Sequence, residues 1–149
     1  MVRDVMREGI VTLLTSTTWR EAAGFLLENH LSAVPVVDGA GVLVGILSEK
    51  DLFRGLYPSY KHWITHPESY TDFNDIEQSA TDVADRAIEL LMEKRVLTTT
   101  PDTLVLKIGA LMVASGIHQV PVLEENKLVG MVSRGEIYRA ILQKYFSLG

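Results

Sequence analysis

Two stretches of the sequence place a serine three residues before an acid, where an apolar run ends. GILSEKD contains Ser48 and Asp51, and GMVSRGE contains Ser133 and Glu136. Ser48 can cap the N-terminus of a helix, with Glu49 and Asp51 in a first turn that favours negative charge. A hydroxyl and a carboxylate at the mouth of a strand-to-helix turn also suit the binding of a sugar. Both interpretations stay open at this point, and one residue can serve both.

Other residues in the sequence offer little catalytic chemistry. His62 and His66 have the i, i+4 spacing of metal ligands on a helix, but the glutamate of the zinc-protease pattern is missing and Pro67 follows at once. The sequence contains no G-x-S-x-G elbow, P-loop or dinucleotide-binding fingerprint. It has no cysteine, which excludes a thiolate nucleophile and a disulfide framework. We therefore expect no catalytic residue, no metal site and no enzymatic function.

Length and composition favour a small globular protein. The chain has 149 residues, 47% of them hydrophobic, which fits one compact domain or two small units that share a core. Its net charge of −5 argues against binding to nucleic acid. No apolar stretch approaches the roughly 18 residues of a membrane span, and the N-terminus lacks the apolar core of a signal peptide. These features predict a cytoplasmic protein.

The chain contains an internal repeat. LSAVPVVDGAGVLVGILSEKDLFRGL begins at Leu31, and IHQVPVLEENKLVGMVSRGEIYRAIL begins 86 residues later at Ile117. Each copy is too short to bury a good core alone, so the two copies should pack together. We expect a first repeat at 1–56, a linker with a helix at 57–85, and a second repeat at 86–149.

Each repeat is expected to run strand, helix, strand, strand, helix. Alternating apolar positions predict strands, apolar positions three and four apart predict helices, and glycine or asparagine marks the turns. Gly116 and His30 lie where each first helix should end in a left-handed residue. A further amphipathic helix is expected in the second half of the linker, ending at Leu91. The first strands are expected at 10–14 and 96–100, and the last helices at 49–56 and 135–145.

The starts of the first helices carry candidate caps. Thr18 with Glu21 resembles a capping box. In the second repeat, Asp102 or Thr103 is expected to cap the helix.

The repeated motifs resemble a tandem pair of cystathionine-β-synthase (CBS) domains, often called a Bateman module. The resemblance rests on the apolar-Pro-Val strand, on the Gly-apolar-apolar-Ser-x-x-acid turn, and on the repetition of both. It covers nearly the whole chain outside 57–85. It implies an α/β fold of two β-α-β-β-α repeats related by a pseudo-two-fold axis, with a helical linker insertion and two clefts between the repeats. It also implies a homodimer that associates through the CBS helices.

The resemblance further implies a regulatory ligand, namely an adenine nucleotide (AMP, ADP or ATP) or S-adenosylmethionine. In the family the carboxylate of the Ser-x-x-Asp turn accepts hydrogen bonds from both ribose hydroxyls, which here assigns the ribose to Asp51. Apolar residues from both repeats would sandwich the purine. The main cleft is expected to contain Ile46, Ser48, Asp51, Met92, Arg95, Leu97, Ile117, His118, Gln119 and Pro121.

His118 matches the position of a phosphate-binding histidine in energy-sensing kinase subunits of the family. The arginine that often follows it is Gln119 here, which weakens the phosphate clamp unless Arg95 compensates. His118 as a structural hydrogen bonder and Arg95 as a solvated residue are the alternatives.

The second cleft is expected to bind ligand more weakly. Glu136 is one methylene longer than Asp51, so its geometry toward ribose is less fixed, and Ser32 stands at the position of His118. The residues assigned to this cleft are Met6, Gly9, Val11, Leu31, Ser32, Met131, Ser133 and Glu136.

Two other functions compete with ligand sensing. The chain can be a dimerisation or interaction scaffold whose clefts stay empty, or a regulatory fragment of a larger transporter or enzyme. In the second case an effector protein or domain receives the signal.

Overall fold

The structure is a computed structural model that describes residues 1–55 and 83–147. The described chain divides into two compact units. Unit 1 comprises Met1–Val11, Ala40–Val44 and the chain from Arg95 onward, and unit 2 comprises Thr12–Gly39 and Gly45–Lys94. His62, His66 and the first half of the linker lie outside the described residues.

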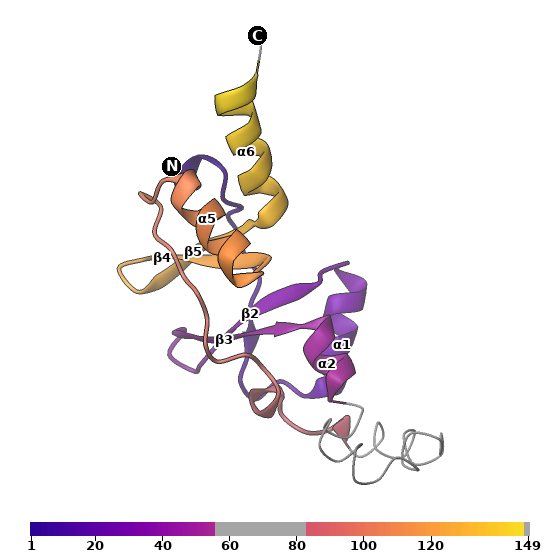
Figure 1. Ribbon diagram of the computed structural model, residues 1–149. Helices are drawn as coiled ribbons and strands as arrows, with labels where there is room; N and C mark the ends of the chain where they lie inside the picture. Colours follow the sequence, from indigo (N-terminus) through magenta and orange to yellow (C-terminus); the bar gives the residue numbers. More distant parts are fainter. Residues whose placement is uncertain (56–82, 148–149) are drawn as a thin grey trace, which may run out of the picture. The chain divides into compact units, whose positions relative to one another are not determined.

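Unit 2 contains most of the first repeat (Figure 1). Its sheet has the order β1-β2-β3, and β1 pairs with β2 in parallel, with Leu13 opposite Val36. Helix α1 buries Trp19, Ala22 and Leu26, which lie three and four residues apart as an amphipathic helix requires. The elements are β1 (Leu13–Leu14), α1 (Trp19–Glu28), β2 (Ala33–Val37), β3 (Leu43–Ser48), α2 (Glu49–Arg54) and the 3-10 helix η3 (Ile88–Leu90).

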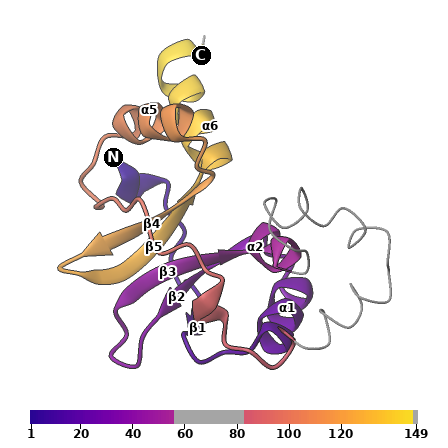
Figure 2. The ribbon, with the colours of Figure 1, turned by 60° about the horizontal axis from the view of Figure 1, so that its bottom comes forward.

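Unit 1 contains most of the second repeat. Strands β4 and β5 form an antiparallel hairpin in which Pro121 lies opposite Met131. Helices α5 and α6 lie side by side next to this hairpin (Figures 1 and 2), and they approach closely where Gly109 faces Ile141. Instead of a first strand, the repeat has a single parallel bridge from Thr99 to Val122. The elements are the 3-10 helix η1 (Val2–Asp4), α5 (Val105–Ser115), β4 (Gln119–Glu124), β5 (Lys127–Ser133) and α6 (Arg134–Phe146). Its core consists of Val2, Val105, Ile108, Met112, Val120, Val122, Val132 and Ile137.

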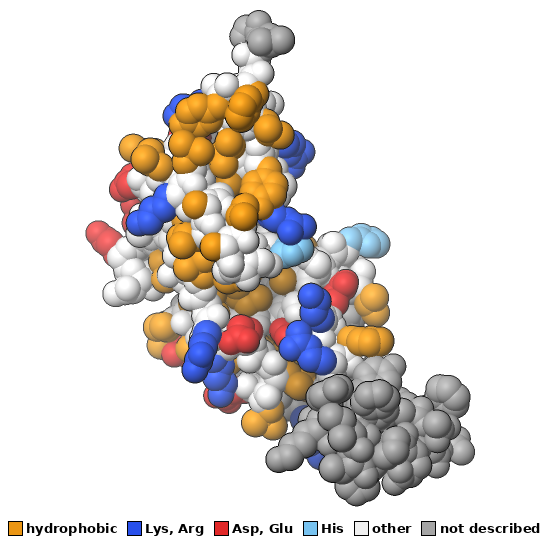
Figure 3. Space-filling model, viewed as in Figure 1, with side chains coloured by type: hydrophobic (Ala, Val, Ile, Leu, Met, Phe, Trp, Pro, Cys, Tyr) orange, Lys and Arg blue, Asp and Glu red, His pale blue; other side chains and the backbone are white. Residues whose placement is uncertain are grey.

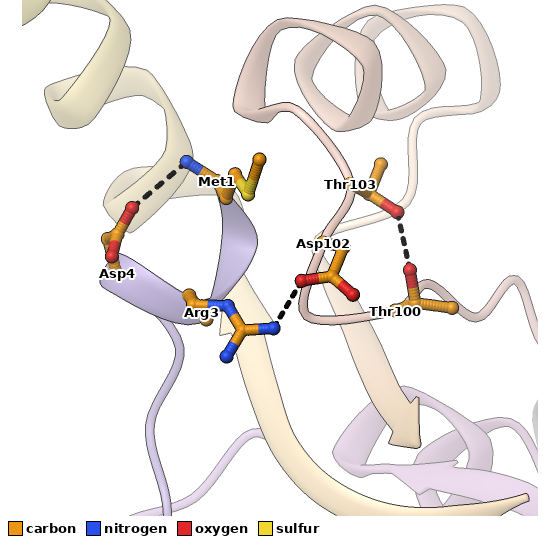
Figure 4. Close-up of polar contacts among 6 residues, drawn as sticks. All are labelled: Met1, Arg3, Asp4, Thr100, Asp102 and Thr103. Carbon is orange, nitrogen blue, oxygen red and sulfur yellow. Dashed lines mark hydrogen bonds and ion pairs between the residues drawn. The ribbon is translucent and has the colours of Figure 1, made fainter. Parts of the chain in front are cut away.

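Residues 1–4 pack and hydrogen-bond within unit 1. Val2 is fully buried, and its backbone N–H donates to the carbonyl of Thr103 at 2.8 Å. Arg3 forms an ion pair with Asp102 (Figure 4), and this hydrogen bond and charge raise the pKa of Arg3 above its ordinary value. The hydroxyls of Thr100 and Thr103 lie 3.0 Å apart in the same loop. Val2 is therefore part of the core of unit 1, which contains most of the second repeat.

The segment that precedes each repeat, called here its leading segment, pairs with a strand of the other repeat, and it does so in an equivalent way in both units. Arg7, which precedes the first repeat's strands, exchanges two backbone hydrogen bonds with Met131 at 2.9 and 3.0 Å. Glu93 stands at the equivalent place before the second repeat and exchanges two such bonds with Ile46, also at 2.9 and 3.0 Å. Each unit thus contains one repeat's strands together with the segment that leads into the other repeat.

The glycine before each Ser-x-x-acid turn, Gly45 or Gly130, allows the backbone of the leading segment to lie close to the strand. A Cβ on Gly45 would lie 2.8 Å from Met92 Sδ and 2.9 Å from the carbonyl oxygen of Glu93. A Cβ on Gly130 would meet Met6 Sδ at the same 2.8 Å and a backbone oxygen at 2.9 Å. Any larger residue would have to displace a backbone segment, so the motif glycine is a packing requirement in both units.

Three local predictions are confirmed. Thr18 Oγ1 accepts a hydrogen bond from the backbone N–H of Glu21 at 3.2 Å and so caps α1. Gly116 and His30 follow the first helices with φ of 72° and 52°, the left-handed conformation expected at those positions.

Two local predictions are wrong. Neither Asp102 nor Thr103 caps α5, whose N-cap is Leu104 without a side-chain hydrogen bond, because Arg3 engages Asp102 and the hydroxyl of Thr100 pairs with that of Thr103. The linker helix does not continue to Leu91. Val83 is helical, the described chain after it has the short η3, and the earlier part of the segment lies outside the described residues.

The helix does not extend to Leu91 because the backbone of Ala87 and Ile88 has other hydrogen-bond partners. Ala87 forms a bridge with Thr18, and the N–H of Ile88 donates to the carbonyl of Thr17 at 2.8 Å. Ile88 is fully buried at this contact. Bonds to the start of α1 therefore replace the i to i−4 bonds that a helix would need.

The remaining differences are at element ends. Helix α2 ends at Arg54 rather than at 56, and α6 is one residue longer than expected at each end. The strand expected at 10–14 is reduced to Leu13–Leu14.

Candidate functional site

The first Ser-x-x-Asp turn joins β3 to α2 in unit 2. Ser48 Oγ accepts from the backbone N–H of Asp51 at 3.1 Å, and Asp51 Oδ2 accepts from the backbone N–H of Ser48 at 2.9 Å. This reciprocal pair is a capping box, so the capping interpretation is confirmed. Among the described residues, nothing donates to the other carboxylate oxygen, Oδ1 of Asp51. The turn therefore holds a partly buried carboxylate in a fixed orientation with one acceptor oxygen still available.

The second turn joins β5 to α6 in unit 1 and differs in its charge. Glu136 Oε1 accepts from the backbone N–H of Ser133 at 3.0 Å and from its hydroxyl at 2.5 Å. Arg7 Nε lies 3.2 Å from the same oxygen, and Arg7 Nη2 donates to Gln119 Oε1 at 3.1 Å. The second carboxylate is thus already paired with a cation of the protein itself.

Each turn is also hydrogen-bonded to the residue just before the other long strand of its unit, β2 in unit 2 and β4 in unit 1. The carbonyl of Ser32 accepts from the N–H of Glu49 at 2.9 Å in unit 2. The carbonyl of His118 accepts from the N–H of Arg134 at 2.9 Å in unit 1. Within a unit, Ser32 therefore lies at the start of the helix that carries Asp51, and His118 at the start of the helix that carries Glu136. The pairing of His118 with Asp51 in one cleft stays a prediction.

The other predicted residues divide between the units in the same way. In unit 2, Met92 is buried beside Gly45, and Ile46 and Leu31 are partly buried. In unit 1, Pro121 and Met131 are buried in the hairpin. Three further unit 1 residues, Met6, Leu97 and Ile117, are packed against the core. The exposed members of unit 1 are Gly9, Val11, Arg95 and His118.

Arg7 lies in contact with the second turn and is a residue that the sequence interpretation missed. A signal for it exists in the repeat, since Arg7 and Glu93 occupy equivalent bridge positions and have opposite charges. Gln119 was assigned to the main cleft from the resemblance, and the structure shows its amide oxygen bound to Arg7 beside Glu136.

The described residues contain no cluster of three or more His, Asp or Glu side chains that could hold a metal ion. Of the helices in the same part of the chain, none combines the length and the apolar character that a membrane span requires.

Comparisons with known proteins agree with this architecture. The family model described as "CBS domain" matches residues 2–57 and 83–143. Uncharacterized protein MJ1426 of Methanocaldococcus jannaschii is 25% identical over 164 residues, covering 95% of this chain and 91% of the relative. The chain spans less than half of two further curated relatives, 42% and 44% of their lengths.

Solved structures show the same fold. The crystal structure of CBSX2 in complex with AMP is 25% identical with a TM-score of 0.72, and the match covers 96% of each chain; CBSX2 comes from Arabidopsis thaliana. The CBS domain pair of protein MJ0100, in complex with 5′-methylthioadenosine and S-adenosyl-L-methionine, is 23% identical with a TM-score of 0.69, and the match covers 97% of each chain. The predicted α/β fold of a tandem repeat is confirmed.

Proposed function

Because the chain belongs to the CBS-domain family, we propose that it is a regulatory, non-catalytic module that binds an adenine nucleotide or an adenosyl compound. The observation that supports this most directly is the carboxylate of Asp51, which keeps one acceptor oxygen available beside Ser48. A carboxylate already oriented by the backbone loses little freedom when a ribose hydroxyl donates to it. The capping box therefore serves as the frame of a ribose site.

AMP is the first ligand to test, with S-adenosylmethionine as the second. CBSX2 has been crystallised in complex with AMP, and the MJ0100 pair with two adenosyl compounds. All of these ligands present an adenine and a ribose, the parts that Ile46, Leu97, Ile117 and Asp51 are proposed to bind. The exposed side chains of His118 and Arg95 are the proposed phosphate contacts.

We also propose that the module forms a homodimer through its helices. Apolar side chains lie on the surface of unit 1 around α5 and α6 (Figure 3), and a second copy would remove them from water. The most exposed are Val113 and Phe146, each 71% exposed. The others in this surface are Leu104, Leu106, Leu142 and Tyr145. A cytoplasmic location and an effector protein or domain that receives the signal complete the proposal.

Calorimetry of the purified chain with AMP, ATP and S-adenosylmethionine tests ligand sensing, together with mass spectrometry of any co-purified compound. We expect saturable binding of at least one of these ligands and a matching rise in Tm, since a ligand that binds only the folded state stabilises it. Absence of binding by all three, with a dimer still present in light scattering, would favour the scaffold alternative instead.

A further inference from the structure

Arg7 and Glu93 give the two Ser-x-x-acid turns opposite electrostatic surroundings. Both residues pair through their backbone with the strand that leads into a turn, Arg7 with Met131 and Glu93 with Ile46. In unit 1 the side chain at this position is a cation, and in unit 2 it is an acid. An acid cannot neutralise the carboxylate of Asp51, whereas Arg7 neutralises that of Glu136.

In the described chain, the contacts of Glu136 all fall on one carboxylate oxygen, Oε1, and they include the cation Arg7. The backbone N–H of Ser133 at 3.0 Å and the Ser133 hydroxyl at 2.5 Å donate to Glu136 Oε1, and Arg7 Nε forms an ion pair with the same oxygen at 3.2 Å. Gln119 holds the other end of the guanidinium at 3.1 Å. Within the described residues, a single backbone amide donates to the carboxylate of Asp51.

An acceptor that already binds a guanidinium is a poor receptor for a neutral hydroxyl. A ribose hydroxyl at the second turn would have to displace the guanidinium, so that an ion pair between two charges is replaced by a hydrogen bond from a neutral donor. The side chain of Glu136 is only 19% exposed, so water would not fully compensate its carboxylate for the loss of the guanidinium.

We infer that Arg7 determines which of the two turns binds ribose: it acts as an internal ligand of Glu136 and withholds the second turn from an adenosyl ligand. This inference rests on the proposed function, because it assumes that a carboxylate turn of this kind binds ribose. The inference gives another reason for unequal ligand binding at the two turns. The ion pair of Glu136 with Arg7 matters more than the extra methylene of the Glu136 side chain.

The test is the stoichiometry of AMP binding in calorimetry. The wild-type chain should bind one equivalent, and R7A should show a second binding event. The new event should discriminate AMP from 2′-deoxy-AMP by roughly 10- to 150-fold, the effect of one lost hydroxyl hydrogen bond to a charged acceptor. Adding E136Q to R7A should remove the second event. This discrimination separates a specificity role from a merely structural one.

R3A is the matched control. Arg3 lies in the same N-terminal segment and forms its ion pair with Asp102, away from the turn. R3A removes the same charge and should leave the stoichiometry unchanged. R7Q, which keeps a longer polar stem, serves as a second variant if R7A melts much lower than the wild type.

The outcomes separate the two proposals. If folded R7A and R7Q bind no more AMP than the wild type, the role of Arg7 is refuted whatever the wild type binds. If the wild type binds none and R7A binds one equivalent, the site at Asp51 is refuted while the role of Arg7 holds. A second event in R3A as well would assign the effect to net charge and refute the inference.

Discussion

Substitutions at Asp51 can separate its structural role from its proposed role in ribose binding. Asp51 Oδ2 accepts from the N–H of Ser48 at 2.9 Å, while nothing in the described chain donates to Oδ1. In D51A both acceptors disappear. In D51N the amide oxygen can still accept from Ser48, and an NH₂ group takes the place of the available oxygen. An amide nitrogen is a donor only, so it cannot accept from a ribose hydroxyl.

The expected magnitudes follow from these bonds. D51A leaves the partly buried N–H of Ser48 without its partner, which should lower the free energy of unfolding by about 1 kcal/mol. For a chain of this size that corresponds to a fall in Tm of roughly 2–4 °C. This differs from the expectation for an uninvolved surface residue, because the carboxylate is part of the capping box. D51N should keep a Tm near that of the wild type.

Both variants should lose ligand affinity. A hydrogen bond to a charged acceptor contributes about 1.5–3 kcal/mol, so the Kd for AMP should rise roughly 10- to 150-fold in D51A and in D51N. Calorimetry gives the Kd, and thermal melts without ligand give the stability. E49Q is the control, since it removes a charge from the same first turn at an exposed side chain. If D51N binds AMP as tightly as the wild type, Asp51 is only a helix cap.

Three further predictions test packing, ligand contacts and assembly. Gly45→Ala should lower the free energy of unfolding by about 1–3 kcal/mol in urea titrations, because its Cβ would lie 2.8 Å from a thioether sulfur and 2.9 Å from a carbonyl oxygen. Gly24→Ala in α1 meets nothing within 4 Å and should raise it by about 0.5–1 kcal/mol; equal effects would contradict this packing argument. His118→Ala should weaken AMP without weakening adenosine in calorimetry, and an equal loss for both ligands would refute a phosphate contact. Phe146→Ser should shift the protein toward monomer in sedimentation, and an unchanged dimer would assign the interface to another surface.

Much of the fold could be predicted because the deciding interactions are local. The spacing of Ser48 and Asp51 predicts a cap, and the structure contains the reciprocal bonds. The positions of His30 and Gly116 predict left-handed helix ends, which depend only on the preceding turn of the helix. The apolar face of α1 follows from its own periodicity.

The parts that could not be predicted depend on contacts between distant segments. Asp102 does not cap α5, because Arg3 of the N-terminus, 99 residues away, engages it. The side chain of Arg7 reaches both Gln119 and Glu136, a grouping that no local pattern indicates. A repeat also shows only that two segments are alike. It cannot say which leading segment pairs with which repeat.

The exchange of leading segments has a consequence for how the protein is made. Unit 2 is complete once Lys94 has left the ribosome, but Met1–Val11 pairs with a strand that ends at Ser133. At about 5–20 residues per second, the 122 residues from Val11 to Ser133 take roughly 6–25 s to synthesise. During that interval the segment 1–11 of the nascent chain cannot pair with β5, and Val2 is not yet buried. Residues 1–11 are therefore synthesised long before the strand that they pair with, and unit 1 can fold only after β5 has been translated.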